Sequence, residues 1–387
     1  MSHAIVRIIE ATAMCGCFSS SIYYLLCLWS GAAFVRRRKE ADRSVRPTRF
    51  MPPVSILKPL KGVDPKIDES FRSHCLQDYP EYEIIFGVHE ADDPAIGSVR
   101  RLQNEFPGRG IRLVVCPEIL GANVKVSNLA QMLEAARYDH LIVNDSDIRV
   151  EPDYLRRVID PLQDSKVGMV TCLYRGVAAG TLGSKLEALG ISTDFCAGVL
   201  AARVVEGIHF GLGSTLAFRR AELEKIGGFA AIADYLADDY ELGKRICDLG
   251  LRVELSEVVV ETFLPAYKFR EFAAHQLRWA RGVRDSRPGG YFGLVFTFGL
   301  AWALVGLIAS RGAFWAWGVF VVTLSLRLAQ AIGVGRFALG DGQVLKSLWI
   351  IPLRDLVAVG VWAAGLFGHR VVWRGDRFQL RNGRLIR

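Results

Sequence analysis

Four long apolar segments constrain the fold of this chain more than any other feature. Each holds about 20 residues with few charges, which is enough for a helix to cross the hydrocarbon core of a bilayer. They are residues 14–34, 291–310, 312–334 and 348–367. The intervening residues 35–290 have the mixed composition of a water-soluble domain. The sequence therefore predicts one large soluble domain between an N-terminal anchor and C-terminal membrane segments.

The positive charge of the chain lies beside these apolar segments. The formal net charge is +8, and basic residues follow the first segment at residues 36–39, 43, 46 and 49 and the last one in residues 368–387. Cations in these positions attract anionic lipid headgroups and keep the adjoining domain in the cytoplasm. We therefore expect an integral membrane protein with a cytoplasmic domain and no nucleic-acid partner. Because the cations follow the first segment, it is expected to be an uncleaved anchor rather than a signal peptide.

The last apolar segment is interrupted by Pro352, Arg354 and Asp355. If this segment crossed the bilayer, the C-terminal arginines from Arg370 to Arg387 would lie outside, against the usual charge bias. We therefore expect the segment to be re-entrant or interfacial.

Cysteine and histidine patterns argue against two other kinds of site. The eight cysteines show no paired spacing in the soluble domain, which is typical of small buried residues in a reducing compartment. The seven histidines form neither a His-x-His nor a His-Glu-x-x-His pattern, so a catalytic zinc is not expected.

Strand-like and helix-like segments alternate through the first half of the soluble domain. The predicted strands are residues 53–57, 82–88, 111–115 and 141–143, and the predicted helices are residues 68–76, 95–106 and 124–137. Alternation at this spacing implies βαβ units with a parallel sheet and right-handed crossovers. An α/β fold of the nucleotide-binding kind is therefore predicted. Further on, residues 182–205 have the pattern of a long helix that lies either in the core or against lipid.

The stretch from Tyr138 to Val150 is the most informative part of the soluble domain. Its predicted strand ends in an acidic cluster that contains Asp145 and Asp147, and open α/β sheets bind their ligands at the C-terminal ends of the strands. On a regular strand, two carboxylates two residues apart would point to one face and converge on a hard divalent cation. An ordinary Asx turn is the alternative interpretation.

Further acidic residues stand at other strand and helix ends. Asp92 and Asp93 follow the second predicted strand, although Asp93 before a proline is also a good helix cap. Asp238 and Asp239 begin a predicted helix, where acidic residues are usually caps as well.

Basic and aromatic residues allow the same two interpretations. Lys125 lies at a predicted helix start, where it could meet a phosphate or remain solvated. Arg278 and Trp279 lie on an amphipathic helix, where they could be an interface anchor. Residues 211–213 do not complete a dinucleotide fingerprint, because Leu occupies position 216.

Together and in this order, these motifs resemble the ceramide glucosyltransferase family, which is family 21 of the glycosyltransferases. The resemblance covers nearly the whole chain and is carried by residues 53–62, 92–95, 121–129, 145–150, 170–176, 238–240, 275–279 and 372–378. The bacterial members that glycosylate hopanoids are especially similar at residues 121–129 and 170–176. The family has a GT-A nucleotide-diphospho-sugar transferase domain.

Applied to this chain, the resemblance implies five regions. They are an N-terminal transmembrane anchor (1–35), a cytoplasmic GT-A catalytic domain (36–265), an amphipathic interface segment with the Arg-Trp motif (266–290), C-terminal transmembrane or re-entrant helices (291–367) and a basic tail (368–387).

The same resemblance implies roles for individual residues. Asp92 or Asp93 would contact the base and ribose of the donor nucleotide, and Lys125 would contact its phosphates. Asp145 and Asp147 would hold Mg²⁺ or Mn²⁺ on the donor diphosphate, so that Asp145 serves both the metal and the donor.

Asp239 would be the catalytic base, and Asp238 beside it would tune the pKa of that base. Arg278 and Trp279 would belong to the donor-binding Q/R-x-x-R-W motif, whose first position is His275 here instead of Gln or Arg.

The expected activity is inverting transfer of glucose or N-acetylglucosamine from a UDP-sugar to a hydroxyl of a membrane lipid, either ceramide or a hopanoid. A processive polysaccharide synthase shares the same motifs, but the few membrane segments here argue against a polymer channel. A non-catalytic membrane protein that binds sugar nucleotides is the other alternative, and the retention of every carboxylate argues against it.

Overall fold

The computed structural model describes residues 3–43, 50–373 and 375–386 and divides into two compact units. The α/β unit comprises Arg38–Ala179, Glu206–Pro265 and the end of the chain from Asp376, and the helical unit comprises the chain up to Arg37, Gly180–Val205 and Ala266–Gly375. Four arginines of the expected basic clusters, Arg46, Arg49, Arg374 and Arg387, lie outside the described residues.

The α/β unit is built on one mixed sheet, whose eight described strands have the order β3-β2-β1-β4-β7-β6-β8-β5. Its strands are β1 (Val54–Leu60), β2 (Tyr82–Val88), β3 (Gly110–Val115), β4 (His140–Val143), β5 (Ile148–Arg149), β6 (Val167–Val177), β7 (Leu216–Arg219) and β8 (Arg252–Phe263). The pairs β1–β2, β2–β3 and β1–β4 are parallel, as the alternation of strands and helices predicts. The strand β7 then runs antiparallel to both β4 and β6.

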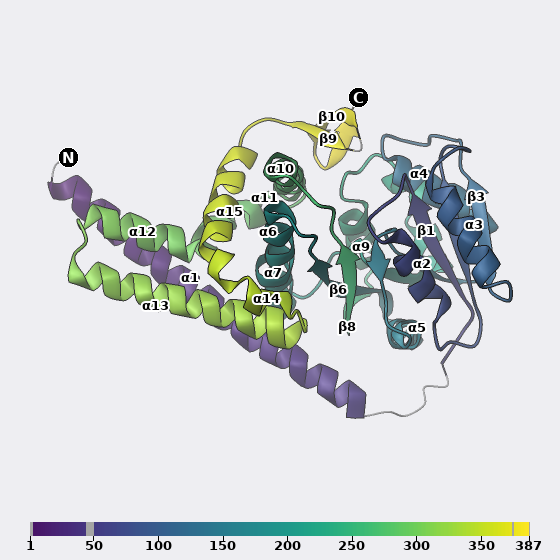
Figure 1. Ribbon diagram of the computed structural model, residues 1–387, viewed down its shortest axis with the longest axis horizontal. Helices are drawn as coiled ribbons and strands as arrows, with labels where there is room; N and C mark the ends of the chain where they lie inside the picture. Colours follow the sequence, from purple (N-terminus) through teal and green to yellow (C-terminus); the bar gives the residue numbers. More distant parts are fainter. Residues whose placement is uncertain (1–2, 44–49, 374, 387) are drawn as a thin grey trace. The chain divides into compact units, whose positions relative to one another are not determined.

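Helices cover both faces of the parallel strands (Figure 1). They are α2 (Ile67–Cys75), α3 (Ala95–Glu105), α4 (Val124–Ala135), α5 (Tyr154–Ile159), α8 (Arg220–Lys225) and α9 (Asp238–Asp248). On one face, Ile84 and Phe86 of β2 share a buried core with Phe71 of α2. On the other face, Gly87 lies so close to Met132 of α4 that a Cβ would clash with its sulfur. This two-sided burial explains why β1 and β2 are mostly apolar, with every residue of both strands buried.

The end of the chain forms a hairpin within the α/β unit. The strand β10 (Asp376–Arg381) pairs antiparallel with β11 (Arg384–Ile386). The two residues between them, Asn382 and Gly383, have φ angles of 51° and 77°, and positive φ at both positions is the conformation that Asn-Gly favours in tight hairpins.

The helical unit contains four helices long and apolar enough to cross a membrane, or five if one bent pair forms a single span, counted over the described residues. Its elements are α1 (His3–Arg43), α6 (Leu182–Gly190), a π-helical turn (Ile191–Phe195), α7 (Cys196–Val205), α10 (Phe269–Ser286), α11 (Pro288–Gly293), α12 (Gly299–Ala309), α13 (Phe314–Ala331), a second π-helical turn (Ile332–Ala338), α14 (Gln343–Lys346), α15 (Ile351–Gly365) and β9 (Arg370–Trp373). Residues 182–205 group with these membrane helices, and therefore lie in this unit.

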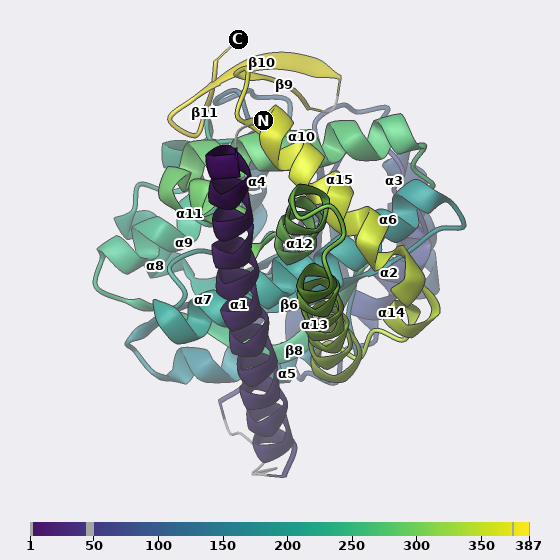
Figure 2. The same cartoon turned by 90° about the vertical axis from the view of Figure 1, so that its left-hand side faces the viewer.

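Close backbone contacts hold α1 against the other apolar helices, and both views show it running alongside α12 and α13 (Figures 1 and 2). A Cβ on Gly16 would overlap the ring of Trp302 in α12. The Tyr24 hydroxyl donates to the Thr297 carbonyl and accepts from the Gly299 backbone N–H, each at 3.2 Å. Dense packing of this kind is what holds helices together in lipid, where apolar burial provides little driving force.

Charges inside the helical unit are paired with one another. The guanidinium of Arg327 on α13 is only 2% exposed and lies 2.8 Å from Asp355 of α15 and 2.6 Å from Asp194. Arg354 lies 3.3 Å from the same Asp194. The two charges that interrupt the last apolar segment are therefore neutralised by partners within the unit.

Candidate functional site

The loop that follows β4 is held by buried hydrogen bonds. The Asn144 amide is fully buried and donates to the Tyr154 hydroxyl at 2.9 Å and to the Ser214 carbonyl at 2.6 Å. Lys58 from β1 is also buried and donates to the Asp145 carbonyl at 2.9 Å. Burial lowers the pKa of Lys58 to about 7, against the opposing effect of nearby carboxylates. The strand ends at Val143, so Asp145 and Asp147 belong to a fixed loop and not to a regular strand.

Asp147 is the more enclosed of the two carboxylates in this loop. Its Oδ2 accepts a hydrogen bond from the Thr262 hydroxyl of β8 at 2.5 Å. Burial, reinforced by repulsion from Asp145, raises the pKa of Asp147 to about 6. Both carboxylates thus contribute to one negative environment.

Lys125 links this loop to the second acidic pair. It lies in the first turn of α4, which Asn123 caps by accepting from the Val126 N–H at 3.2 Å. The Lys125 ammonium lies 2.8 Å from Asp145 Oδ1 and 3.1 Å from Asp238 Oδ2. Burial opposes its charge, but the carboxylates together outweigh burial and raise the pKa of Lys125 above its usual value. Lys125 is therefore a fixed cation between Asp145, which follows a strand, and Asp238, which begins a helix.

Asp239 is oriented by two backbone amides. Its Oδ2 accepts from the Gly213 N–H at 2.7 Å and its Oδ1 accepts from the Tyr240 N–H at 2.8 Å. Burial and the neighbouring charge of Asp238 raise the pKa of Asp239 to about 6. A carboxylate held in this way can accept a proton near neutral pH.

Gly213 leaves open the space between the two acidic groups. A Cβ at this position would lie 3.1 Å from Asp145 Oδ2 and 3.3 Å from Asp239 Oδ2. The structure therefore brings Asp145 and Asp239 together, although 94 positions separate them in the sequence (239 minus 145). Sequence reasoning set residues 211–213 aside because they complete no dinucleotide fingerprint, and it missed this role.

The donor set in this region fits a hard divalent cation. Asp145 and Asp147 offer carboxylate oxygens, and glycine at position 213 keeps the space beside Asp145 Oδ2 open. No group of three or more His, Cys, Asp and Glu residues suited to a metal occurs among the described residues. Two carboxylates are enough for Mg²⁺, which usually completes its shell with water and substrate phosphates.

Asp92 and Asp93, after β2, differ in their surroundings. Asp93 accepts from the Gly62 N–H at 3.0 Å and from the Ala95 N–H at 2.8 Å, so it ties the loop after β1 to the start of α3. Asp92 is exposed. Of the two, Asp92 has the carboxylate that is available to a ligand.

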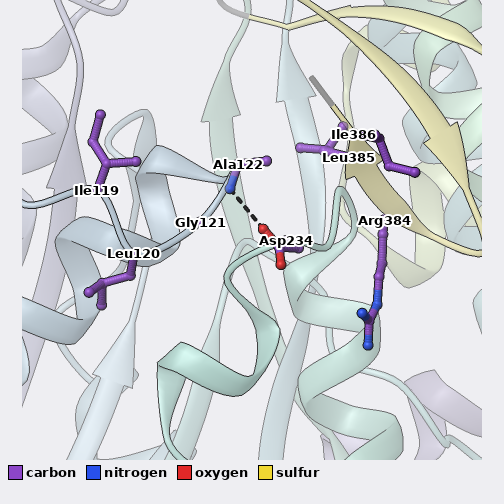
Figure 3. Close-up of a pocket in the computed structure, with 8 residues that line it drawn as sticks. All are labelled: Ile119, Leu120, Gly121, Ala122, Asp234, Arg384, Leu385 and Ile386. Carbon is purple, nitrogen blue, oxygen red and sulfur yellow. Dashed lines mark hydrogen bonds between the residues drawn. The ribbon is translucent and has the colours of Figure 1, made fainter.

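The segment before α9 is held from two sides. On one side, Asp234 accepts from the Ala122 N–H at 3.0 Å, as Figure 3 shows. On the other, β11 bonds to the same segment, because the Leu236 N–H donates to Gly383 at 3.0 Å and the Leu385 N–H donates to Asp234 at 2.7 Å. A cavity of about 490 Å³ lies here, lined by Ile119, Leu120, Gly121, Ala122, Asp234, Arg384, Leu385 and Ile386. The hairpin therefore supports the segment that leads to Asp238 and Asp239.

The Arg-Trp motif lies on α10 in the helical unit. His275 and Trp279 are in contact, with ring centroids 5.1 Å apart. His275 Nδ1 also lies 3.1 Å from Oε1 of the buried Glu187 on α6. Arg278 is half-buried on the same helix.

An α/β unit with acidic groups gathered after β4, in a chain that also carries long apolar helices, has the architecture expected of a membrane-associated glycosyltransferase. Comparison with known families makes the assignment specific. The chain belongs to glycosyl transferase family 21, whose family model matches residues 12–386.

Individual relatives agree with this assignment. "Ceramide glucosyltransferase 1" of Caenorhabditis elegans is 23% identical over 97% of this chain and 81% of its own length. "Ceramide glucosyltransferase 3" of the same organism is 24% identical over 88% of this chain and 75% of its own length.

A solved structure shares the fold. A mannosyltransferase from Pyrobaculum calidifontis, determined in complex with GDP-Man and Mn²⁺, has a TM-score of 0.52 and 20% sequence identity, and the match covers 93% of this chain and 99% of the other. The expected GT-A fold with apolar helices at the N-terminus and in the C-terminal region is thereby confirmed.

Proposed function

We propose that this protein transfers glucose or N-acetylglucosamine from a UDP-sugar to a hydroxyl of a membrane lipid, ceramide or a hopanoid, with inversion at the anomeric carbon. The observation that carries this proposal is the convergence of Asp145, Lys125 and Asp239 beside Gly213. The relatives named as ceramide glucosyltransferases support the choice of sugar and lipid.

Asp239 is the group proposed to activate the acceptor hydroxyl. In-line displacement needs one base within hydrogen-bond reach of that hydroxyl, and a single displacement inverts the anomeric centre. Both oxygens of Asp239 are fixed by backbone N–H groups, which aim the carboxylate without help from a mobile side chain. A base of this kind contributes about 10² to 10⁴ in rate.

Asp145 and Asp147 are the proposed ligands of a divalent cation on the donor diphosphate. When bound, Mg²⁺ or Mn²⁺ would offset the negative charge that develops on the leaving diphosphate. The complex of the mannosyltransferase with Mn²⁺ supports this assignment. Lys125 fixes the orientation of Asp145 through the 2.8 Å ion pair and adds a positive charge where phosphates would lie.

The remaining donor contacts come from the family resemblance. Asp92 is proposed to bind the ribose or base, and Arg278 and Trp279 are proposed to contribute to donor binding. Arginine suits a diphosphate because its guanidinium can form two parallel hydrogen bonds.

The proposed orientation places the α/β unit on the cytoplasmic side of a bacterial inner membrane. The basic residues 36–39 at the end of the first apolar segment support it. Acceptor lipids would then arrive from the bilayer around the helical unit.

Lipid analysis tests the proposed function directly. The purified protein in lipid nanodiscs is supplied with Mg²⁺, with UDP-glucose or UDP-N-acetylglucosamine, and with ceramide or a hopanoid in separate reactions. Mass spectrometry should find one new lipid whose mass exceeds the acceptor by a single sugar residue. A polymeric product would instead identify a processive synthase, and binding of UDP-sugar without any UDP release would identify a non-catalytic binder.

A further inference from the structure

Glu187 is a fully buried carboxylate in the helical unit, on the candidate membrane span Leu182–Val205. Its two oxygens have different partners on α10. Oε1 lies 3.1 Å from His275 Nδ1, and Oε2 accepts from the Gln276 side chain at 3.0 Å. A buried carboxylate is costly unless its hydrogen-bonding capacity is used, so these two contacts fix α6 against the beginning of the Arg-Trp motif.

The contact with Glu187 determines which nitrogen of His275 carries its proton. A carboxylate only accepts hydrogen bonds, so the proton of His275 must be on Nδ1. The ring is also fixed by stacking on Tyr267, with centroids 5.6 Å apart, and by contact with Trp279 at 5.1 Å. The orientation of the imidazole is therefore set on three sides.

The second nitrogen of His275 is left available. Nε2 makes no hydrogen bond in the part of the chain that the structure describes, and the side chain is 21% exposed. In its neutral form the ring presents a lone pair at Nε2, and the carboxylate behind Nδ1 makes that lone pair a better acceptor. The matching ligand group is a hydroxyl, because it can donate one hydrogen bond.

Gln276 extends the arrangement to a third helix. Its Oε1 accepts from Arg354 on α15 at 3.2 Å, while its amide donates to Glu187. Gly190 permits this contact, because a Cβ there would overlap the Arg354 guanidinium. Three helices thus fix two consecutive residues of the motif, which leaves His275 little freedom to turn away.

We propose that His275 Nε2 accepts a hydrogen bond from a hydroxyl of the lipid acceptor, and that Glu187 is the positioning residue that aims it. The proposal rests on the lipid-glycosyltransferase function above. Its surroundings suit a lipid, because His275 lies between the aromatic rings of Tyr267 and Trp279 and beside a candidate membrane span.

Four variants distinguish an effect on the orientation of His275 from an effect on protein stability alone. His275→Phe keeps an aromatic ring and removes the nitrogen, whereas His275→Gln restores an oxygen acceptor. Glu187→Gln keeps the shape of the buried side chain. Because an amide can donate as well as accept, it no longer fixes the proton of His275 on Nδ1. The matched control is Asp341→Asn, because Asp341 is another buried carboxylate of the same unit and accepts from Ser192 at 2.7 Å.

Binding of a radiolabelled ceramide to the full-length protein in nanodiscs, without donor, is the first measurement. Loss of one hydrogen bond corresponds to about a tenfold change in affinity. We expect Kd for ceramide, and KM for ceramide in the transfer reaction, to rise about tenfold in His275→Phe and Glu187→Gln. The KM for the UDP-sugar should change far less. His275→Gln and Asp341→Asn should stay close to wild type in lipid affinity.

Two results would overturn the proposal. One is wild-type ceramide affinity in both His275→Phe and Glu187→Gln. The other is an equal rise in the KM values of donor and lipid. If Glu187→Gln lowers Tm far more than Asp341→Asn does, the His275→Phe and His275→Gln pair decides, since both keep Glu187. Absence of any glycolipid product from wild type would instead refute the proposed function, and it is recognised before any variant is compared.

Discussion

Replacing Asp239 by asparagine tests the proposed base. The two oxygens of Asp239 accept from the Gly213 and Tyr240 N–H groups at 2.7 and 2.8 Å. An asparagine has one acceptor oxygen, so one of these N–H groups would face an amide that cannot accept. That lost bond should cost about 1–3 kcal/mol of stability. Loss of the base should lower kcat by about 10²- to 10⁴-fold, which corresponds to about 3–5 kcal/mol in the activation barrier.

The assay for Asp239→Asn must separate these two effects. Release of UDP in the presence of a lipid acceptor gives kcat, calorimetric titration with UDP gives donor binding, and thermal unfolding gives stability. Asp248→Asn is the matched control, because Asp248 is exposed on the same helix α9 and pairs with the exposed Lys244 at 3.8 Å. We expect the control to keep its kcat and Tm. A kcat for Asp239→Asn within a few-fold of wild type would refute the assignment of the base.

Three further predictions concern the charges around the site and inside the helical unit. Asp147→Ala should abolish the dependence of UDP binding on Mg²⁺, measured by titration with and without the metal, and an unchanged metal dependence would contradict the proposed ligand. Asp239 must be deprotonated to act, so kcat should fall as the pH drops through about 6; Asp238→Asn removes a repelling charge and should move this acidic limb of the pH–rate profile to lower pH. Arg327→Leu removes the ion-pair partner of Asp355, whereas Asp194 keeps Arg354 at 3.3 Å. The loss of the buried guanidinium should cost about 3–5 kcal/mol, seen as a lower Tm, and Arg336→Leu, at an exposed position of the same helical run, should not.

The sequence was sufficient to predict the parallel half of the sheet. In β1, β2 and β4 the apolar runs are buried on both faces, and each ends where a turn or an acidic cluster begins. The signal is weaker for β8, where the polar pair Ser256 and Glu257 interrupts the apolar run and resembles a break between two strands. In the structure the strand continues, and the Ser256 hydroxyl accepts from the Val258 N–H at 3.2 Å within it.

The hairpin at the end of the chain was missed, although its signal is present. Residues 368–387 were predicted only as a basic tail. Phe378 and Leu380 alternate with polar residues, and Asn382-Gly383 then supplies a favoured two-residue turn. The many arginines of this segment are typical of a charged tail, and they obscure the alternation of apolar and polar residues that indicates a strand.

The candidate site was predictable only in part. Asp145, Asp147 and Asp239 stand out because carboxylates follow apolar strands or begin a helix. Lys58 and Gly213 do not stand out, because their roles depend on tertiary contacts with residues far away in the sequence. Glu187 was missed for the same reason, because its partners lie about 90 positions away on α10.

The contact between β11 and the segment before α9 also sets an order of assembly. The last strand of the α/β unit is synthesised after every apolar helix of the chain. Because this strand supplies the outer support of the segment that leads to Asp239, the α/β unit acquires its final form only after all of these helices have been synthesised.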